Sequence, residues 1–152
     1  MPTFDTDSAL QLDHQLCFAL YSASLAMTKL YTPLLSELQL TYPQYLVLLV
    51  LWEQDGLTVS ALGDRLYLNS GTLTPLLKRM EASGWLQRQR ASDDERRVLV
   101  SLTQAGRQLK TQAASIPPCV AQATNCSLSK LMVLTRDLKA LRDQIHTATH
   151  DS

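Results

Sequence analysis

The sequence predicts a mainly α-helical fold with a small β-hairpin, arranged as a winged helix-turn-helix in a single domain spanning residues 1–152. Three observations predict this fold. Apolar residues recur at helical spacing over most of the chain. Two short helical patterns lie close together over residues 58–81. Two strand-like segments then follow, over residues 85–90 and 98–102, and a polar loop joins them.

The N-terminal region begins with a predicted helix over residues 8–31, where apolar side chains recur every three or four positions. Pro33 interrupts this pattern, so we expect a separate short helix within residues 32–40. Pro43 opens the next helix, which contains the apolar run of residues 46–52. That run is shorter than the roughly 18 residues that a bilayer-spanning helix needs, so no membrane contact is expected.

The helix-turn-helix follows from capping residues. Thr58 can cap one helix, and Asn69 or Ser70 can cap the next, because their side-chain oxygens accept hydrogen bonds from first-turn N–H groups. We expect Gly71 to supply the sharp turn between the two helices. Pro75 is then expected in the first turn of the second helix, where a proline costs little.

The hairpin and the C-terminal helices complete the chain. Gly84 ends the second helix of the pair, and Thr103 begins a helix that runs to the Ile-Pro-Pro break at residues 116–118. The last helix follows Ser127 and carries an apolar seam at spacings of three and four, made by Leu131, Leu134, Leu138, Leu141 and Ile145. We therefore expect residues 8–40 and 104–148 to form dimerisation helices around a winged region of residues 42–103.

A winged helix-turn-helix indicates DNA binding, because its second helix enters the major groove and its hairpin reaches the backbone or minor groove. The chain has no net charge, but residues 65–97 hold seven basic and four acidic side chains. An ordinary solvated face is the alternative, yet their position favours phosphate contact. The expected DNA-binding residues are Ser70, Thr72, Thr74, Lys78, Arg79, Arg88, Arg90, Arg96 and Arg97, with Asp94 orienting Arg96.

The cysteine count indicates free thiols. The chain has three cysteines, an odd number, without zinc-ligand spacing, which is typical of a reducing compartment. The first ten residues lack the basic segment of a signal peptide, so we expect a cytoplasmic protein. His14 and Cys17 are too few for a metal site, and no catalytic constellation is present, so we expect no metal, no cofactor and no enzyme activity.

Cys17 admits two interpretations. It lies in an apolar helix, and Tyr31, Tyr42 and Tyr45 follow within thirty residues. A free cysteine in such a helix is more often inert packing than a reactive group. Phenol hydroxyls near a thiolate can lower its pKa, however, which would make Cys17 a redox sensor.

The chain resembles the MarR family of winged-helix regulators. The resemblance rests on the wing segment, through Asp94, Arg96, Leu102, Thr103 and Gly106. Three further segments are similar to the two-cysteine subgroup of organic hydroperoxide resistance regulators: residues 16–21, 42–53 and 70–81. In that subgroup an acidic residue often precedes the recognition helix, where this chain has Asn69.

The resemblance implies a homodimeric transcriptional repressor. Its reduced form would bind an inverted-repeat operator in double-stranded DNA, and an organic hydroperoxide would release it by oxidising Cys17. Tyr31 and Tyr42 would support the Cys17 thiolate, and Cys126, with Cys119 as second choice, would resolve the oxidised sulfur in a disulfide.

Two alternatives remain open at the level of sequence. The wider family suggests a repressor that senses a small aromatic ligand instead of peroxide. A reactive thiol could also turn over as a thiol peroxidase, although the chain lacks a second catalytic constellation.

Overall fold

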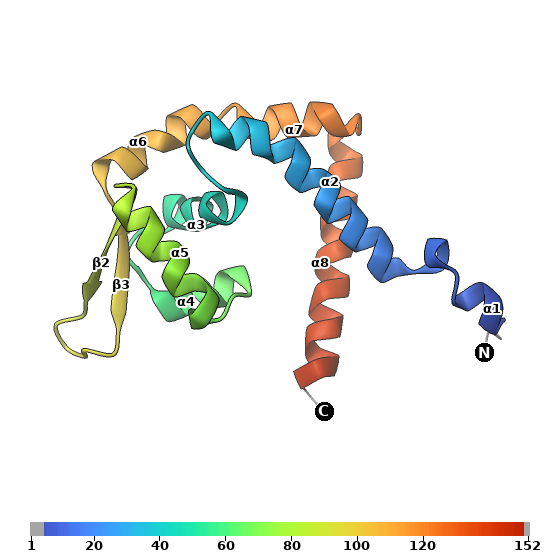
Figure 1. The fold of residues 1–152 in the computed structure, drawn as a ribbon, viewed down its shortest axis with the longest axis horizontal. Coiled ribbons are helices and arrows are strands. Elements are labelled where there is room, and N and C mark those ends of the chain that lie inside the picture. The colour runs from blue at the N-terminus through green and yellow to red at the C-terminus, as the bar shows by residue number, and fades with distance from the viewer. Residues whose placement is uncertain (1–4, 151–152) are drawn as a thin grey trace. The chain divides into compact units, whose positions relative to one another are not determined.

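The computed structural model describes residues 5–150, and these form a mainly helical fold with a small antiparallel sheet (Figure 1). The chain divides into two compact units, one reaching to Ala114 and one beginning at Ser115. The predicted fold class, mainly α with a β-hairpin wing, is confirmed. No helix within residues 5–150 combines the length and apolar character needed to cross a membrane.

The N-terminal region differs from the sequence prediction at both ends. A short helix α1 (Thr6–Ala9) and a 3-10 turn η1 (Leu12–His14) precede one long helix, α2 (Leu16–Ser36). The predicted break at Pro33 is wrong, because α2 continues through it. A helical proline costs about 3 kcal/mol, and burial of Leu35, which is 1% exposed, offsets part of that cost.

Helix α3 (Tyr42–Glu53) begins and ends as its sequence predicts. Thr41 and Gln44 form a capping box at its start, and Pro43 lies in its first turn. After the helix, the chain turns at Gly56, which has a positive φ of 74°. Three of its side chains are almost fully buried at the centre of the first unit: Val47, Leu48 and Leu51.

The helix-turn-helix consists of α4 (Val59–Leu66), capped by Thr58, and α5 (Ser70–Ala82), capped by Asn69. The predicted role of Gly71 is wrong, because it lies inside α5. Tyr67 makes the turn instead, with a left-handed backbone of φ 58° and ψ 36°. A Cβ at Gly63 would lie 2.6 Å from the Leu68 carbonyl oxygen, so this tight turn requires glycine there.

Pro75 lies in the second turn of α5 and not in the first, because Asn69 starts the helix earlier than expected. Its ring is exposed, and the helix stays regular enough to bury one apolar stripe. That stripe follows helical spacing and packs into the core: Leu73, Leu76, Leu77 and Met80.

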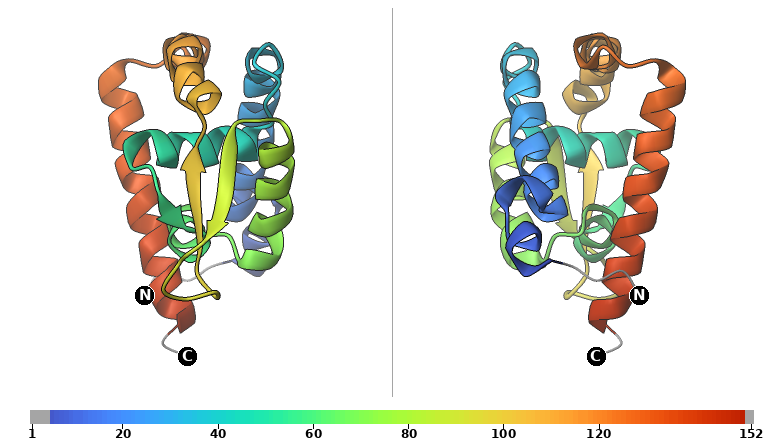
Figure 2. Two further views of the ribbon diagram at one scale, coloured as in Figure 1. Left: turned by 90° about the vertical axis from the view of Figure 1, so that its left-hand side faces the viewer. Right: turned by 90° about the vertical axis from the view of Figure 1, so that its right-hand side faces the viewer.

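Three strands form the sheet in the order β1-β3-β2: β1 (Leu57–Thr58), β2 (Leu86–Arg90) and β3 (Val98–Leu102). All pairs are antiparallel, with Leu86 opposite Leu102 and Arg90 opposite Val98. Strands β2 and β3 are the predicted wing, while β1 was too short to be predicted. Figure 2 shows this hairpin extending beyond the helices of the first unit.

Helix α6 (Gln104–Ala113) is capped by Thr103 and ends the first unit. In the second unit, the Ile-Pro-Pro segment starts a new helix, α7 (Ile116–Thr124), because a proline fits well in a first turn. Ser127 caps α8 (Leu128–His150). None of the α8 side chains is fully buried in the single chain, and most of its leucine seam is exposed.

Candidate nucleic-acid interface and redox site

The outer face of α5 carries the polar residues that the sequence predicts for DNA contact. Ser70, Thr72, Lys78 and Arg79 are exposed, and Thr74 is half-buried. Their exposure follows from the opposite stripe of α5, which the core covers. The start of α5 therefore presents two hydroxyl side chains to the outside, and its later turns present two cations.

The wing tip exposes one arginine far more than the others. The side chain of Arg96 is 94% exposed. The backbone N–H of Arg96 donates a hydrogen bond to the Asp94 carboxylate at 2.9 Å. Arg97 pairs with Asp93 at 3.3 Å, and Arg90 donates to the Glu95 carbonyl at 2.8 Å. These last two contacts brace the loop, which leaves Arg96 extended into solvent.

Arg88 has a different environment from the other predicted DNA contacts. Glu81 accepts a hydrogen bond from its backbone N–H at 2.8 Å and an ion-paired one from its guanidinium at 3.2 Å. Its side chain is only 23% exposed. The backbone hydrogen bond from Arg88, followed by its side-chain hydrogen bond, lowers the pKa of Glu81, so this pair stays charged and ties α5 to β2.

A groove of about 790 Å³ lies between the start of α5 and the wing. Its lining includes Asn69, Ser70 and Thr74, three arginines of the wing (Arg88, Arg96 and Arg97), and residues of α4, among them the single carboxylate of Asp64. Hydroxyl donors, a helix N-terminus and guanidinium groups around one concave surface are a phosphate-binding arrangement.

Cys17 is an exposed free thiol near the start of α2. Tyr31 lies fourteen positions further along that continuous helix, which corresponds to about 21 Å along the axis. A hydrogen bond between these two residues within one chain is therefore excluded. His14, the other residue considered for a metal, makes a 2.7 Å hydrogen-bonding contact with the Ser8 carbonyl. Residues 5–150 contain no cluster of three metal-ligand side chains.

Three tyrosines form an aromatic cluster where α2 meets α3. The ring of Tyr31 lies 5.0 Å from that of Tyr42 and 5.9 Å from that of Tyr45, and Tyr42 lies 6.4 Å from Tyr45. Burial, and then the neighbouring phenols, raise the pKa of Tyr31 above 10.0. Its hydroxyl therefore stays protonated at neutral pH and can donate a hydrogen bond.

The other two cysteines belong to the second unit: Cys119 lies near the start of α7, and Cys126 lies between α7 and α8. Cys119 is exposed on α7, and its thiol is free. Cys126 is half-buried, and its thiol donates to the Thr124 carbonyl at 3.4 Å. Asn125, with a left-handed φ of 54°, makes the turn that positions Cys126 before α8.

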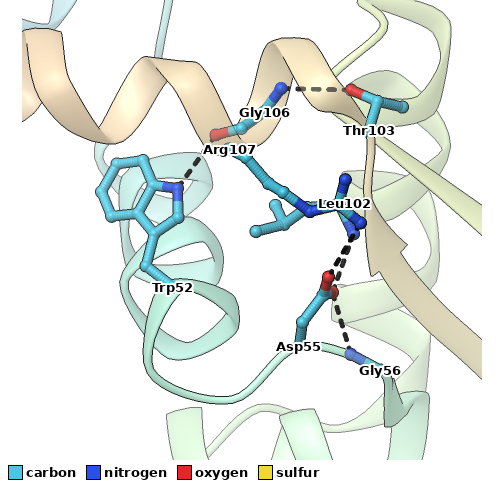
Figure 3. Close-up of polar contacts among 7 residues, drawn as sticks. All are labelled: Trp52, Asp55, Gly56, Leu102, Thr103, Gly106 and Arg107. Atoms are coloured by element: carbon cyan, nitrogen blue, oxygen red, sulfur yellow. Dashed lines mark hydrogen bonds and ion pairs between the residues drawn. The ribbon is translucent and has the colours of Figure 1, made fainter.

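The base of the wing has polar contacts that the sequence does not predict (Figure 3). The Trp52 indole N–H donates to the Gly106 carbonyl at 2.9 Å. Asp55 accepts from the backbone N–H groups of Gly56 and Leu102, each at 2.9 Å, and pairs with Arg107 at 3.5 Å. Trp52 was hidden in an apolar run, and its partner is 54 residues away, so no local pattern could reveal the contact.

These contacts also explain the wing residues that carry the family resemblance. Thr103 donates to the Gly84 carbonyl at 2.6 Å and caps α6 by accepting from Gly106 at 3.1 Å. A Cβ at Gly106 would collide with the Trp85 carbonyl oxygen. Each of these residues thus fixes the base of the hairpin, which indicates a wing whose orientation is held firmly.

Comparison with known proteins gives one consistent family. Residues 29–113 match the family described as transcriptional regulator SarA/Rot. The chain is 51% identical over 138 residues to the organic hydroperoxide resistance transcriptional regulator of Bacillus subtilis, covering 91% of this chain and 89% of that protein. It is 50% identical over 140 residues to the regulator TtmR of Methylorubrum extorquens, covering 92% of this chain and 72% of that protein.

Solved structures agree with these matches. Reduced AbfR bound to DNA has a TM-score of 0.78 and 35% identity, covering 93% of this chain and 99% of AbfR. A disulfide form of AbfR, a protein of Staphylococcus epidermidis, has a TM-score of 0.60 and 36% identity over 90% of this chain and 96% of AbfR. A mutant MarR of E. coli complexed with operator DNA has a TM-score of 0.75 and 26% identity over 83% of this chain and 92% of MarR.

Proposed function

Because this chain belongs to the MarR family of winged-helix transcriptional regulators, we propose that it is a homodimeric repressor that senses organic hydroperoxides. The reduced dimer binds an inverted-repeat operator, and oxidation of Cys17 releases it. The observation that carries this proposal is an exposed thiol on α2 in a chain whose wing and recognition helix present a phosphate-binding groove.

Operator binding rests on α5 and the wing. The hydroxyls of Ser70, Thr72 and Thr74 face base edges and phosphates in the major groove, and Lys78 and Arg79 contact the backbone. Arg96 reaches the minor groove or its phosphates, and Asp94 orients it. Arg90 and Arg97 shape the wing, and Arg88, bound to Glu81, fixes its angle to α5.

Dimerisation rests on apolar side chains that the single chain leaves exposed. On α2 these include Leu16, Tyr21 and Leu25, which are at least 50% exposed. On α8, Leu134 and Leu138 are 45% exposed along the leucine seam. Burying these two stripes requires a second copy, so we assign residues 8–40 and 104–148 to the dimer and residues 42–103 to DNA binding.

A dimer would also allow tyrosines to reach Cys17 from the other subunit. Because about 21 Å of helix separates Cys17 from Tyr31 within one chain, the phenols that support the Cys17 thiolate belong to the other subunit. Tyr31 and Tyr42 of one subunit would then donate hydrogen bonds to the sulfur of the other. Such donors lower the pKa of a thiol and make it reactive toward peroxide.

The redox step proceeds in two reactions. The Cys17 thiolate attacks the hydroperoxide, an S–O bond forms, the O–O bond breaks, and the alcohol leaves after taking a proton. A second thiolate then attacks the sulfenic acid, an S–S bond forms, and water leaves. The protein is the reductant and is consumed once for each event, so the proposal requires no turnover and no cofactor.

The second thiol comes from α7 or from the segment that joins α7 to α8 in the other subunit. Cys126, directly before the capped start of α8, is the first candidate. Cys119 is the second candidate and is the more exposed of the two thiols in the single chain. A Cα separation of about 4.4–6.8 Å is needed for either disulfide.

Selection of binders from a randomised pool of DNA duplexes tests operator recognition. We expect an enriched inverted repeat whose half-sites lie about one helical turn apart. Enrichment of a single half-site, or of no sequence, would contradict a dimeric operator-binding protein.

Nonreducing electrophoresis after treatment with cumene hydroperoxide tests the redox step. Wild type should give a crosslinked dimer, and Cys17→Ser should give none. Cys126→Ser should lose the crosslink and Cys119→Ser should keep it, and the reverse pattern would exchange their roles. An undiminished crosslink in Cys17→Ser would contradict the sensing assignment.

A further inference from the structure

We propose that Trp52 is a positioning residue that couples the state of Cys17 to the orientation of the wing, with Asp55 as a second anchor. The inference rests on the proposed function, because it needs Cys17 to sense the peroxide. It adds a physical route between the sensing thiol and the DNA-contacting hairpin. All residues of this route lie in the first compact unit.

The route begins at the tyrosine cluster. Tyr42 and Tyr45 both lie in the first turns of α3, and each ring contacts Tyr31 of α2. When Cys17 is oxidised, its sulfur loses negative charge and no longer accepts hydrogen bonds as a thiolate does. The phenols that donated to it must then find other partners, which alters the packing at the start of α3.

The middle of the route is an aromatic contact along α3. The ring of Tyr45 lies 6.5 Å from that of Trp52, with an interplanar angle of 70°, an edge-to-face arrangement. Tyr45 is 4% exposed, and Leu48 and Leu51 on the same helix are at most 1% exposed. A helix packed this tightly shifts as a unit and does not absorb a change at one end.

The end of the route is the base of the wing, shown in Figure 3. Trp52 holds the first turn of α6 through the Gly106 carbonyl at 2.9 Å. Asp55 holds the last residue of β3 through the Leu102 N–H, also at 2.9 Å. Strand β3 runs from this anchored base toward the loop that carries Arg96, so a shift of α3 re-aims the wing tip.

The first experiment measures DNA affinity for reduced and oxidised protein with Trp52→Phe, using a duplex obtained by the selection above. Phenylalanine keeps the aromatic contact with Tyr45 but removes the hydrogen bond to Gly106. We expect the DNA affinity of the reduced variant to stay within about threefold of that of reduced wild type. The ratio of the Kd of the oxidised protein to that of the reduced protein should fall by about five- to thirtyfold. Mass spectrometry should show equal oxidation of Cys17 in both proteins.

Trp85→Phe is the matched control. Trp85 also lies at the base of the wing, but its buried indole N–H has no hydrogen-bond partner among residues 5–150. Its replacement removes no hydrogen bond, so the Kd ratio should equal that of wild type. A ratio in Trp52→Phe that also equals the wild-type ratio would overturn the inference and leave the proposed function intact. A wild-type ratio near one would overturn both.

A spectroscopic measurement covers the case in which Trp52→Phe does not fold. The chain has two tryptophans, so in Trp85→Phe all indole emission comes from Trp52. Oxidation of Cys17 should shift that emission as the contact with Gly106 changes, and Cys17→Ser should show no shift. Unchanged emission in a protein that is oxidised and has released DNA would show that the signal does not pass through Trp52.

Discussion

Among single residues, Gly106 cannot accept a side chain, because a Cβ there would collide with the backbone carbonyl of Trp85. We predict that Gly106→Ala destabilises the protein by about 2–4 kcal/mol, because the Trp85 carbonyl is backbone and cannot move aside cheaply. Denaturant unfolding measures this. Gly71→Ala is the control, since its Cβ would meet only the Asn69 side chain at 3.3 Å, and it should stay within about 1 kcal/mol of wild type. Equal denaturant midpoints of unfolding for Gly106→Ala and Gly71→Ala would contradict the close approach of the Trp85 carbonyl to Gly106.

Arg96 gives a second test at the residue scale, because its 94% exposed side chain has no other evident structural task than its Asp94 contact. If Arg96 contacts a base, Arg96→Ala should weaken operator binding by about 1–3 kcal/mol. If it contacts a phosphate, the slope of log affinity against log salt concentration should fall in magnitude by about one. Affinity at several salt concentrations measures both. Lys110→Ala, an exposed cation of α6 outside the groove, is the control. An unchanged affinity and slope in Arg96→Ala would remove the wing tip from the interface.

Among elements, the junction between α5 and β2 depends on charge. Because the folded-state pKa of Glu81 is lowered, its contribution to stability is present above the ordinary value of 4.5 and is lost as pH falls through the folded pKa. The unfolded chain binds the proton first, so acid favours unfolding. Glu81→Gln should be less stable than wild type near neutral pH, and the difference should shrink below pH 4.5. A difference that is constant from pH 7 to pH 3 would contradict this.

Helix starts could be predicted from the sequence better than the turn between the paired helices. Thr58 and Asn69 cap their helices as predicted, because a cap joins a side chain to a backbone N–H only two or three residues away. Thr103 and Ser127, predicted only to stand at the starts of their helices, are caps as well. The turn of the helix pair was misassigned to Gly71. Tyr67 adopts the left-handed conformation instead, which is uncommon for a bulky residue and which no local pattern marks.

Some residues of the candidate site could likewise be predicted from local patterns, and others could not. The exposed face of α5 follows from helical spacing, so its residues could be named from the sequence. The bond between Trp52 and Gly106 and the pair of Glu81 with Arg88 join separate elements, and no local pattern marks them. That Tyr31 cannot reach Cys17 of the same chain follows from the unbroken helix between them, which the prediction over residues 8–31 already contained.

For the whole molecule, the leucine seam of α8 predicts the oligomeric state. Leu134→Asp places a charge in the stripe that a second copy must bury, so the protein should become monomeric at micromolar concentration and lose cooperative operator binding. Light scattering measures the mass. Ala140→Asp adds the same charge to an exposed position outside the seam and should remain dimeric. A dimeric Leu134→Asp would place the interface elsewhere.

In the proposed mechanism, one covalent event at Cys17 controls DNA binding by the whole dimer. Fluorescence anisotropy of a labelled operator duplex tests it most directly, with wild type and Cys17→Ser titrated with cumene hydroperoxide. Both reduced proteins should bind, wild type should release the duplex near one equivalent of peroxide per subunit, and Cys17→Ser should stay bound. Release of DNA by Cys17→Ser at the same dose would contradict the account.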